Sequence, residues 1–289
     1  MFKYVILIPS FNDWECLNLL IPKIDNTLKN INEVVSILII NDGSTKKSNL
    51  TFEKINCLKK IEILNLKNNV KAQIAIATGL NFLRKEKFQG GIIVMDADGQ
   101  DSPEQLIDII NLSKKEPEKT ITINRTSRED ELAFKILYQI YLSLGFLFTF
   151  KYFKFGVYSY MHSNSLNKIL STDDIYMAFA GSLAKHFKKK NIIFAPRKKR
   201  IFGESKNNYL SLIYYGLKII SIFKYRVLVN SLILVLLVLL SFGSENIFSF
   251  FLLTILLFNI IIFLSSYKIN KSNTKNTLLN IKNIESVKN

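Results

Sequence analysis

The sequence is poor in residues that build many catalytic and metal sites, with two cysteines and two histidines among 289 residues. Cys16 and Cys57 lie too far apart for a metal-binding spacing, and we expect both to be buried thiols. His162 and His186 have no metal-binding partner nearby in the sequence, so we expect structural or surface roles. No serine or cysteine lies in an arrangement typical of nucleophilic catalysis. Chemistry based on these residue types is therefore not indicated.

Charge is nearly absent from one late part of the chain. Between Arg226 and Lys268 the only charged side chain is Glu245. Two apolar stretches, 227–243 and 247–267, are separated by the polar turn "SFGSEN". A membrane-spanning helix needs roughly 20 apolar residues, with about 17 as a lower limit, so the second stretch qualifies and the first is marginal. We predict a two-helix transmembrane hairpin within residues 226–268; the alternative is a buried helical hairpin.

Basic residues flank both outer ends of this predicted hairpin, and by the positive-inside rule both ends then face the cytoplasm. They are Lys218, Lys224 and Arg226 before it and Lys268, Lys271 and Lys275 after it. We therefore expect a multi-pass protein of the inner or plasma membrane with a cytoplasmic catalytic domain. Residues 207–225, apolar on most faces, suit a helix in the membrane interface, and residues 269–289 form a cytoplasmic basic tail.

The formal net charge of +16 raises the question of nucleic-acid binding. No recognised nucleic-acid motif accompanies it, and the basic excess is concentrated late, in "KHFKKKN", "PRKKR" and the tail. Beside a membrane, such charge faces anionic lipid headgroups or a phosphorylated substrate. We expect a membrane partner and no nucleic acid, and charge alone does not choose between the two anionic partners.

Apolar runs alternate with amphipathic segments over the first 125 residues, which predicts an α/β domain with a mainly parallel sheet covered on both faces. The expected strands are 3–8, 34–40, 61–66, 91–95 and 119–124, and the expected helices are 14–30, 46–59, 72–87 and 103–115. The later pattern is less regular. It indicates helices at 130–150 and 173–187 and a strand at 192–195, with the aromatic-rich stretch 151–162 left ambiguous.

Polar clusters follow the predicted strands, and ligands of open α/β sheets bind outside the carboxyl ends of the strands. Asp96 and Asp98 can converge on one ion there, and ligands of oxygen alone suit Mg²⁺ or Mn²⁺. Two such residues are also common as solvated turn residues. Asp13 and Asp42 could accept hydrogen bonds from a base or a ribose. Asp13 could equally cap a helix, and for Ser44 the helix-cap interpretation is favoured.

Four segments resemble family-2, GT-A-type (Rossmann-like) glycosyltransferases in their order and approximate spacing: "ILIPSFND", "LIINDGST", "IIVMDADGQDSPEQL" and "RIFGESK". With the terminal hairpin, the chain looks most similar to the polyprenyl-phosphate branch, which includes dolichol-phosphate mannose synthase and bacterial membrane-anchored relatives. The resemblance covers most of residues 1–267. It implies a GT-A domain at 1–206, followed by the interfacial helix, the hairpin and the tail.

The resemblance also implies roles for particular residues. Nucleotide-site positions are Pro9, Phe11, Asp13 and Asp42; metal ligands for Mg²⁺ or Mn²⁺ are Asp96, Asp98 and Gln100; Asp101 and Glu104 match the acidic end of that motif; and Arg200, Gly203, Ser205 and Lys206 match a loop that closes over phosphate groups. Asp98, Asp101, Arg200 and Lys206 are the expected catalytic residues. Asp96 and Gln100 would also contact the donor.

The activity implied is inverting transfer of a sugar from a nucleotide-sugar, with UDP or GDP as the nucleotide, to an undecaprenyl- or dolichyl-type polyprenyl phosphate. A lipid phosphate is already ionised at neutral pH, so such a reaction depends on positioning and charge stabilisation more than on a general base. Two alternatives remain open: transfer to a hydroxyl of a cell-surface glycan, and a degenerate relative without catalysis. The sequence leaves the sugar, the nucleotide and homo-oligomer formation undetermined.

One departure from the family bears on the acceptor half of the reaction. The family's mid-chain Asp and "GFR"-like segment are replaced here by "KFGVYSYMHS". Arg125 and Arg128, after the fifth strand, could supply positive charge, or they could be solvated loop residues. The sequence therefore indicates the donor half of a site better than the acceptor half.

Overall fold

Eight strands form one sheet in the order β7-β5-β6-β4-β1-β2-β3-β8. Six of them run parallel to one another: β1 (Lys3–Ser10), β2 (Val34–Asn41), β3 (Leu58–Leu66), β4 (Gly91–Val94), β5 (Thr120–Arg128) and β7 (Lys190–Arg197). The antiparallel strands are β6 (Phe155–His162) and β8 (Ile281–Lys288). This computed structural model describes residues 3–52, 55–128, 132–203, 209–241, 245–267 and 277–288. The mainly parallel α/β class is confirmed.

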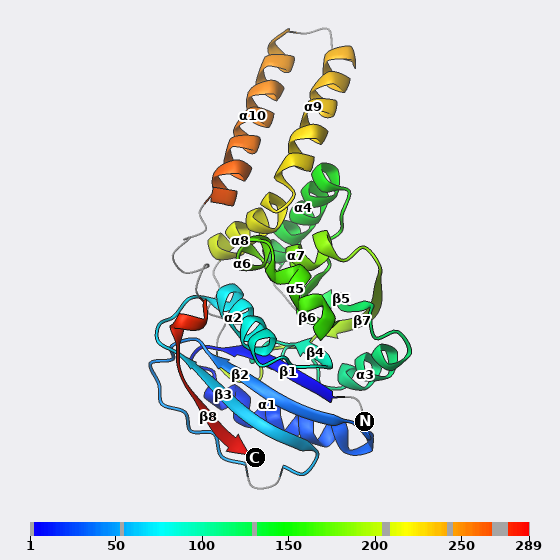
Figure 1. The fold of residues 1–289 in the computed structure, drawn as a ribbon. Coiled ribbons are helices and arrows are strands. Elements are labelled where there is room, and N and C mark those ends of the chain that lie inside the picture. Colours follow the sequence, from blue (N-terminus) through cyan, green and yellow to red (C-terminus); the bar gives the residue numbers. More distant parts are fainter. Residues whose placement is uncertain are drawn as a thin grey trace.

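Strand β1 lies in the middle of the sheet and is buried on both faces. Alternate side chains enter two cores: Val5 and Leu7 pack on one side, and Ile6 and Ile8 pack on the other. The first core is covered by α2 (Ala72–Lys85), α5 (Leu166–Leu170), α6 (Asp174–Met177) and α7 (Phe179–His186), and the second by α1 (Trp14–Thr27) and α3 (Gln105–Lys115) (Figure 1). The almost uninterrupted apolar composition of β1 follows from this two-sided burial.

The helix expected at 46–59 is wrong for the described residues of that segment. They are irregular up to Cys57, and β3 begins at Leu58. Side chains at and near α1 bind the backbone instead: Asn12 Oδ1 accepts from Lys46 N–H at 3.0 Å, and Asn18 Oδ1 accepts from Thr51 N–H at 3.1 Å. Because these contacts satisfy backbone groups that a helix would pair internally, an extended crossing is stable here. Ser44 consequently caps no helix, and its Oγ accepts from Asn12 N–H.

The ambiguous aromatic stretch contains β6, which pairs antiparallel with both β4 and β5 in the interior of the sheet. Its tyrosine hydroxyls reach backbone carbonyls: Tyr158 Oη donates to Ser102 O at 3.1 Å and Tyr160 Oη donates to Pro117 O at 3.0 Å. Burial of tyrosine is tolerated where its hydroxyl has such a partner. Strand β5 is also longer than expected and includes Arg125 and Arg128, which the sequence had placed after it.

The end of the predicted basic tail joins the sheet. Residues 277–280 form a short 3₁₀ helix (Thr277–Asn280), and β8 then pairs antiparallel with β3. Asn65 Nδ2 of β3 donates to Glu285 Oε1 of β8 at 2.9 Å. The last described residues therefore belong structurally to the same sheet as β1.

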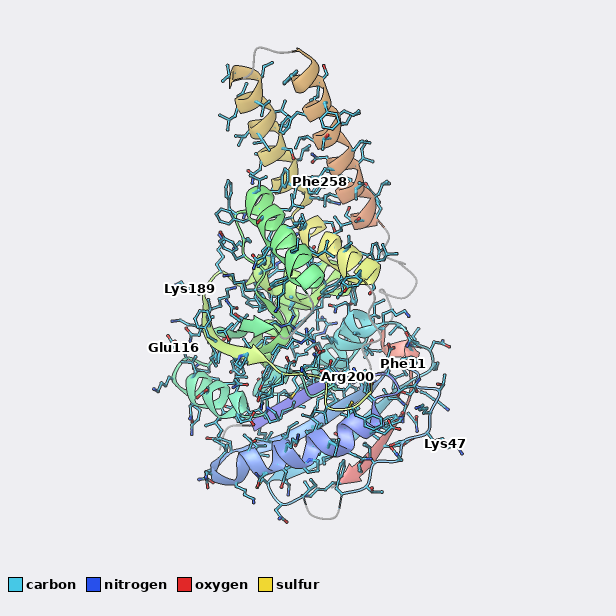
Figure 2. The ribbon with its side chains drawn as sticks, turned by 180° about the vertical axis from the view of Figure 1, so that it is seen from behind. Phe11, Lys47, Glu116, Lys189, Arg200 and Phe258 are labelled. Atoms are coloured by element: carbon cyan, nitrogen blue, oxygen red, sulfur yellow. The ribbon has the colours of Figure 1, made fainter. Side chains whose placement is uncertain are left out.

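Four further helices lie beyond one face of the sheet: α4 (Leu132–Thr149), α8 (Tyr209–Ser221), α9 (Lys224–Ser241) and α10 (Glu245–Tyr267). Helices α9 and α10 form a hairpin that projects from the domain, with α4 beside its base (Figures 1 and 2). Within the described residues, one helix is long and apolar enough to cross a membrane by itself, over Phe248–Tyr267 of α10. Helices α8 and α9 meet this criterion only as a pair, which is bent by 86°.

Candidate active site

The acidic residues predicted from the strand ends gather at one edge of the sheet. Strands β1 and β4 are parallel with Leu7 opposite Val94, and β1 and β2 are parallel with Ser10 opposite Asn41. The chain therefore leaves all three strands at the same edge, where Asp13, Asp42 and Asp96 follow. The predicted gathering of these acidic residues at one edge of the sheet is confirmed.

The segment from Asp96 to Asp101 is an acidic loop held by its own side chains. Asp96 N–H donates to Asp101 Oδ2 at 3.1 Å, and Gln100 N–H donates to Asp98 Oδ1 at 3.0 Å. Gly99 has a φ of +73°, a conformation that glycine adopts without steric cost. The turn brings three carboxylates together within six residues of chain.

Burial of this loop and mutual repulsion shift its titration. The pKa of Asp96 is raised first by burial and then by the charges of Asp101 and Asp98. Burial also raises the pKa of Asp101, while the guanidinium groups of Arg125 and Arg197 counteract the shift. Like charges this close favour a proton or a cation between them. The acidic loop is therefore poised to bind positive charge.

A basic loop, residues 197–203, begins at the last residue of β7 and lies directly on the acidic loop. Lys198 N–H donates to Gln100 O at 3.1 Å, Gln100 Nε2 donates to Lys198 O at 3.2 Å, and Ile201 N–H donates to Asp98 O at 3.1 Å. A Cβ on Gly99 would collide with the Ile201 side chain. The packing of Ile201 on the acidic loop and the positive φ together favour glycine at this position.

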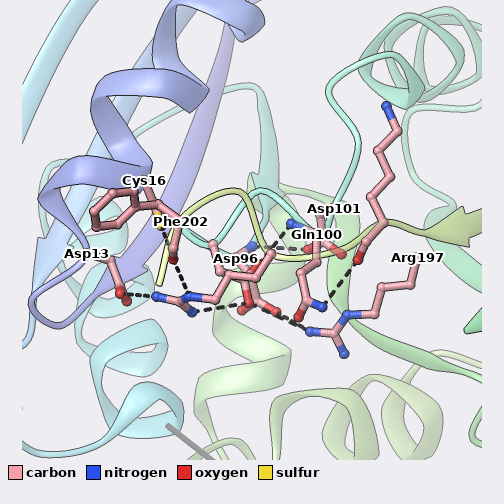
Figure 3. A network of polar contacts seen from close by, with 10 residues as sticks. Asp13, Cys16, Asp96, Gln100, Asp101, Arg197 and Phe202 are labelled. Carbon is pink, nitrogen blue, oxygen red and sulfur yellow. Dashed lines mark hydrogen bonds and ion pairs between the residues drawn. The ribbon is translucent and has the colours of Figure 1, made fainter. Parts of the chain in front are cut away.

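Two arginines of the basic loop face the acids (Figure 3). Arg197 Nη2 lies 3.8 Å from Asp96 Oδ2 and 3.9 Å from Asp98 Oδ2. Arg200 forms an ion pair with Asp13 through Nη2, and its Nη1 lies 3.8 Å from Asp98 Oδ2. Asp13 precedes α1 but its side chain does not cap that helix. The ion pair, not the helix cap, is the structural role of this carboxylate.

The conformation of the basic loop is fixed near Arg200. Arg200 Nε donates to Phe202 O at 2.8 Å, and the Cys16 thiol donates to the same carbonyl at 3.3 Å. Cys16 is buried, as expected from the sequence, whereas Cys57 is only half-buried. The loop is therefore anchored on α1 as well as on the acidic loop.

The other predicted donor-site residues differ in their surroundings. Asp42 is 3% exposed, its Oδ1 accepts from Val70 N–H at 2.7 Å, and burial raises the pKa of its carboxyl to about 6. Pro9 is buried within β1. The pairing of β1 with β4 ends at Leu7, so the strand tolerates a residue without a backbone N–H at position 9. Phe11 follows β1 and is half-buried. Ser205 and Lys206 lie outside the described residues.

The sequence did not single out Arg197, although it lies in the basic segment "PRKKR". Arg197, Arg125 and Asp101 line one pocket beside the acidic loop, together with Tyr158 and Gly156. A Cβ on Gly156 would collide with the Arg125 guanidinium. Among the described residues, Arg197 Nε and Gln105 Oε1 are buried without a hydrogen-bond partner, and Gln105 also lines this pocket. Such orphaned groups suit a polar ligand.

The described residues contain no group of three or more His, Cys, Asp or Glu side chains arranged around a metal position. Asp96 and Asp98 nevertheless point to one common cation, the Arg197 guanidinium. A Mg²⁺ or Mn²⁺ ion held by one or two carboxylates plus substrate oxygens needs no larger protein ligand set. The residues present therefore fit a divalent metal of that kind.

Comparison with known proteins identifies the family. Residues 5–170 match the model of glycosyl transferase family 2, which covers more than half of the chain. The chain belongs to this family.

A curated relative, the uncharacterized glycosyltransferase YkcC of Bacillus subtilis (strain 168), is 27% identical over 134 residues, which are 46% of this chain and 40% of that protein. Among solved structures, glucosyl-3-phosphoglycerate synthase from Mycobacterium tuberculosis, in complex with Mn²⁺, UDP-glucose and phosphoglyceric acid, matches with a TM-score of 0.52 and 10% identity. The match covers 78% of this chain and 80% of that one. The structural similarity establishes the GT-A fold, and the polyprenyl-phosphate branch is not distinguished by these matches.

Proposed function

We propose that this protein transfers a sugar from a nucleotide-sugar to a polyprenyl phosphate at the cytoplasmic face of a membrane. One observation carries the proposal: Arg197 and Arg200 cover the carboxylates of the acidic loop at the ligand-binding edge of a family-2 fold. A metal-bound diphosphate requires carboxylates on one side and basic groups on the other. The mycobacterial enzyme of similar fold, which was solved with Mn²⁺ and UDP-glucose, supports a UDP-sugar as the first donor to test.

Asp96 and Asp98, with Gln100 beside them, would hold the Mg²⁺ or Mn²⁺ ion. When bound, the metal supplies positive charge that stabilises the diphosphate leaving group. Arg200 would contact the diphosphate from the opposite side, and Asp13 orients its guanidinium through their ion pair. Lys206, which the family resemblance assigns to the same loop, would add a second cation. Asp42 would contribute to the nucleotide site by fixing the loop that follows β3.

An anionic acceptor fits the charge distribution beside Asp101. Arg125 and Arg197 line the pocket there, and Arg197 Nε has no hydrogen-bond partner among the described residues. These two guanidinium groups would offset the repulsion between an acceptor phosphate and the donor diphosphate. The sequence lacks the family's mid-chain "GFR"-like segment. Arg125 and Arg197 would supply the positive charge that this segment provides in the family. An ionised phosphate needs no strong general base.

The membrane part of the proposal rests on α9 and α10. Strand β8 pairs with β3, so the chain after α10 returns to the same side of any membrane as the catalytic domain. A single crossing by α10 alone would separate them; two crossings, by α9 and α10, do not. The aromatic rings of Tyr225 and Tyr267 lie 5.4 and 5.2 Å from Lys224 Nζ at the base of the hairpin. Aromatic and basic residues are typical of a membrane interface.

The decisive experiment incubates purified full-length protein with Mn²⁺, a panel of radiolabelled UDP- and GDP-sugars, and undecaprenyl phosphate as the only acceptor. We expect a labelled lipid product from one donor and its loss in Asp98→Asn. Asp108→Asn serves as the matched control because Asp108 is an exposed carboxylate on α3. A parallel reaction offers glycan acceptors instead of the lipid. Product from the glycans but not from the lipid phosphate would show that the acceptor is a glycan hydroxyl. Nucleotide binding without transfer to either acceptor would identify a non-catalytic relative.

A further inference from the structure

Helix α4 exposes a row of large apolar side chains that no other described element covers. Ile136, Ile140 and Leu147 are 53%, 50% and 45% exposed, and Phe150, just after the helix, is 65% exposed. Spacings of four and seven residues place the helical members on one face of α4. The opposite face is buried against the helices beside it, with Leu142 4% exposed. A contiguous apolar surface of this kind on a stable helix indicates a binding partner.

The tip of α4 reaches past the base of the hairpin and touches both α9 and α10. The rings of Phe148 on α4 and Phe258 on α10 lie 4.6 Å apart. Asn230 Nδ2 of α9 donates to Phe148 O at 2.9 Å. Asn230 is six residues beyond Lys224, or about 9 Å along the helix, and Phe258 is nine residues before Tyr267, or about 13 Å. Figure 2 shows Phe258 on the projecting part of α10, beyond the catalytic domain.

These distances set the level of the α4 tip relative to the membrane. If the ring of aromatic residues around Lys224 marks the interface, the tip contacts the hairpin from about 3 Å (Arg226) to about 13 Å (Phe258) further into an apolar layer of roughly 30 Å. From the same observations we infer that the C-terminal part of α4 and Phe150 insert into the lipid bilayer, as a third membrane-embedded element beside α9 and α10. The inference rests on the proposed membrane hairpin.

The polar groups of the α4 tip are satisfied in the way that insertion requires. The last carbonyls of a helix have no partner within it, and in hydrocarbon no water can replace one. Arg226 Nη1 donates to Thr149 O at 3.2 Å, and Asn230 binds Phe148 O. Phe150 N–H donates to Phe146 O at 2.8 Å. Side chains of α9 thus donate hydrogen bonds to the last carbonyl groups of α4. In a helix that ends in water, solvent molecules would make these hydrogen bonds.

Basic and aromatic residues follow the tip on the chain's return to the sheet. The ring of Tyr152 stacks on Phe146 with centroids 4.5 Å apart, and Lys154 Nζ lies 5.6 Å from the Tyr152 ring. Lysine stems can lie along apolar surface while the ammonium group reaches anionic headgroups. This order, apolar tip and then aromatic and basic residues, favours a lipid surface as the partner over a second protein chain.

Lipid quenching of tryptophan tests the inference on the full-length protein. Leu147→Trp and Phe150→Trp are each reconstituted in phosphatidylcholine–phosphatidylglycerol vesicles with brominated or unbrominated acyl chains. The only natural tryptophan, Trp14, is 1% exposed in the core at the start of α1, so the wild-type fluorescence gives the baseline. Leu256→Trp, at an exposed position on α10 two residues from Phe258, is the control for the hairpin. Phe194→Trp, at an exposed position on β7, is the control for the catalytic domain.

We expect bromine to remove the added fluorescence of Leu147→Trp and Phe150→Trp to the same extent as that of Leu256→Trp, and to leave Phe194→Trp unchanged. Quenching at position 256 without quenching at 147 and 150 would overturn the insertion of α4, but it would still support the membrane insertion of the α9–α10 hairpin. No quenching at 256 would overturn the hairpin and α4 insertion together. Tryptophans at 147 and 150 shielded from acrylamide but not quenched by lipid would identify a protein partner, which also overturns the inference. The two positions, one on α4 and one just after it, protect the test against one misfolded variant.

Discussion

Arg200 forms an ion pair with Asp13, a residue 187 positions away in the sequence, and thereby joins the basic loop to the exit of β1. The same guanidinium approaches Asp98 of the acidic loop. One side chain therefore links three separate segments of the site: the start of α1, the acidic loop and the loop after β7. The relationship gives Arg200 a position in which it can contact both the acids and an incoming diphosphate.

Replacement of Arg200 by alanine should reduce sugar transfer. Loss of a charge-assisted hydrogen bond costs about 1.5–3 kcal/mol, which corresponds to an approximately ten- to hundredfold lower kcat/KM. Arg200→Lys should recover part of the activity, since it restores the charge without the two-pronged geometry. Lys198→Ala is the matched control, because Lys198 is on the same loop but pairs with Glu104. Equal losses in Arg200→Ala and Lys198→Ala would indicate a general effect of loop charge.

Asp25 should be a main stabilising residue of the irregular segment before β3. Its carboxylate is 5% exposed and accepts from the N–H groups of Asn56, Cys57 and Leu58 at 3.0, 2.8 and 2.8 Å. Asp25→Ala leaves these donors without their partner and should lower the free energy of unfolding by about 2–4 kcal/mol. Unfolding in detergent micelles can be followed by the fluorescence of Trp14 on the same helix. Asn26→Ala, at the exposed neighbouring position, should change stability little.

Gly99 and Gly203 allow backbone strain to be separated from steric collision. Both have positive φ, +73° and +70°, so alanine should cost about 1 kcal/mol at either position from conformation alone. A Cβ at Gly99 would also collide with Ile201, whereas a Cβ at Gly203 meets no atom of the described residues within 4 Å. Gly99→Ala should therefore destabilise the protein more, by a further 1–3 kcal/mol or so. Equal midpoints of thermal unfolding for the two variants would contradict this contact.

Asp42 should make stability depend on pH between its unfolded and folded pKa values, 3.8 and about 6. The folded state binds the proton more tightly, so stability is highest below this window and falls as pH rises through it, by up to about 3 kcal/mol. Asp42→Asn removes this titration. The stability of the wild-type protein relative to Asp42→Asn should therefore decrease from pH 4 to pH 7, as measured by denaturant unfolding at each pH. A constant difference would show that the carboxyl is not perturbed.

Several elements of the fold follow from local pattern alone. The apolar runs of β1, β2 and β4 and the amphipathic periodicity of α1, α2 and α3 place these elements within a few residues of the sequence-based expectation. Periodicity failed at 46–59, because Asn12, Asn18 and Asp25 satisfy that segment's backbone from outside it. It also failed at β8, whose sequence is polar and gains its partner only from β3. A strand at the edge of a sheet needs no strongly apolar pattern.

The sequence by itself determined the acidic loop, because carboxylates directly after a buried strand must lie at the edge where parallel strands end. The tertiary structure decided which cations meet them. Arg197 and Arg200 are about 100 residues distant from Asp96 and Asp98, and only the pairing of β7 with β5 and the backbone contact of the two loops bring them within 4 Å. Long-range ion pairs leave no periodic signal in a sequence, since their geometry depends on how strands are ordered in the sheet and not on neighbouring residues.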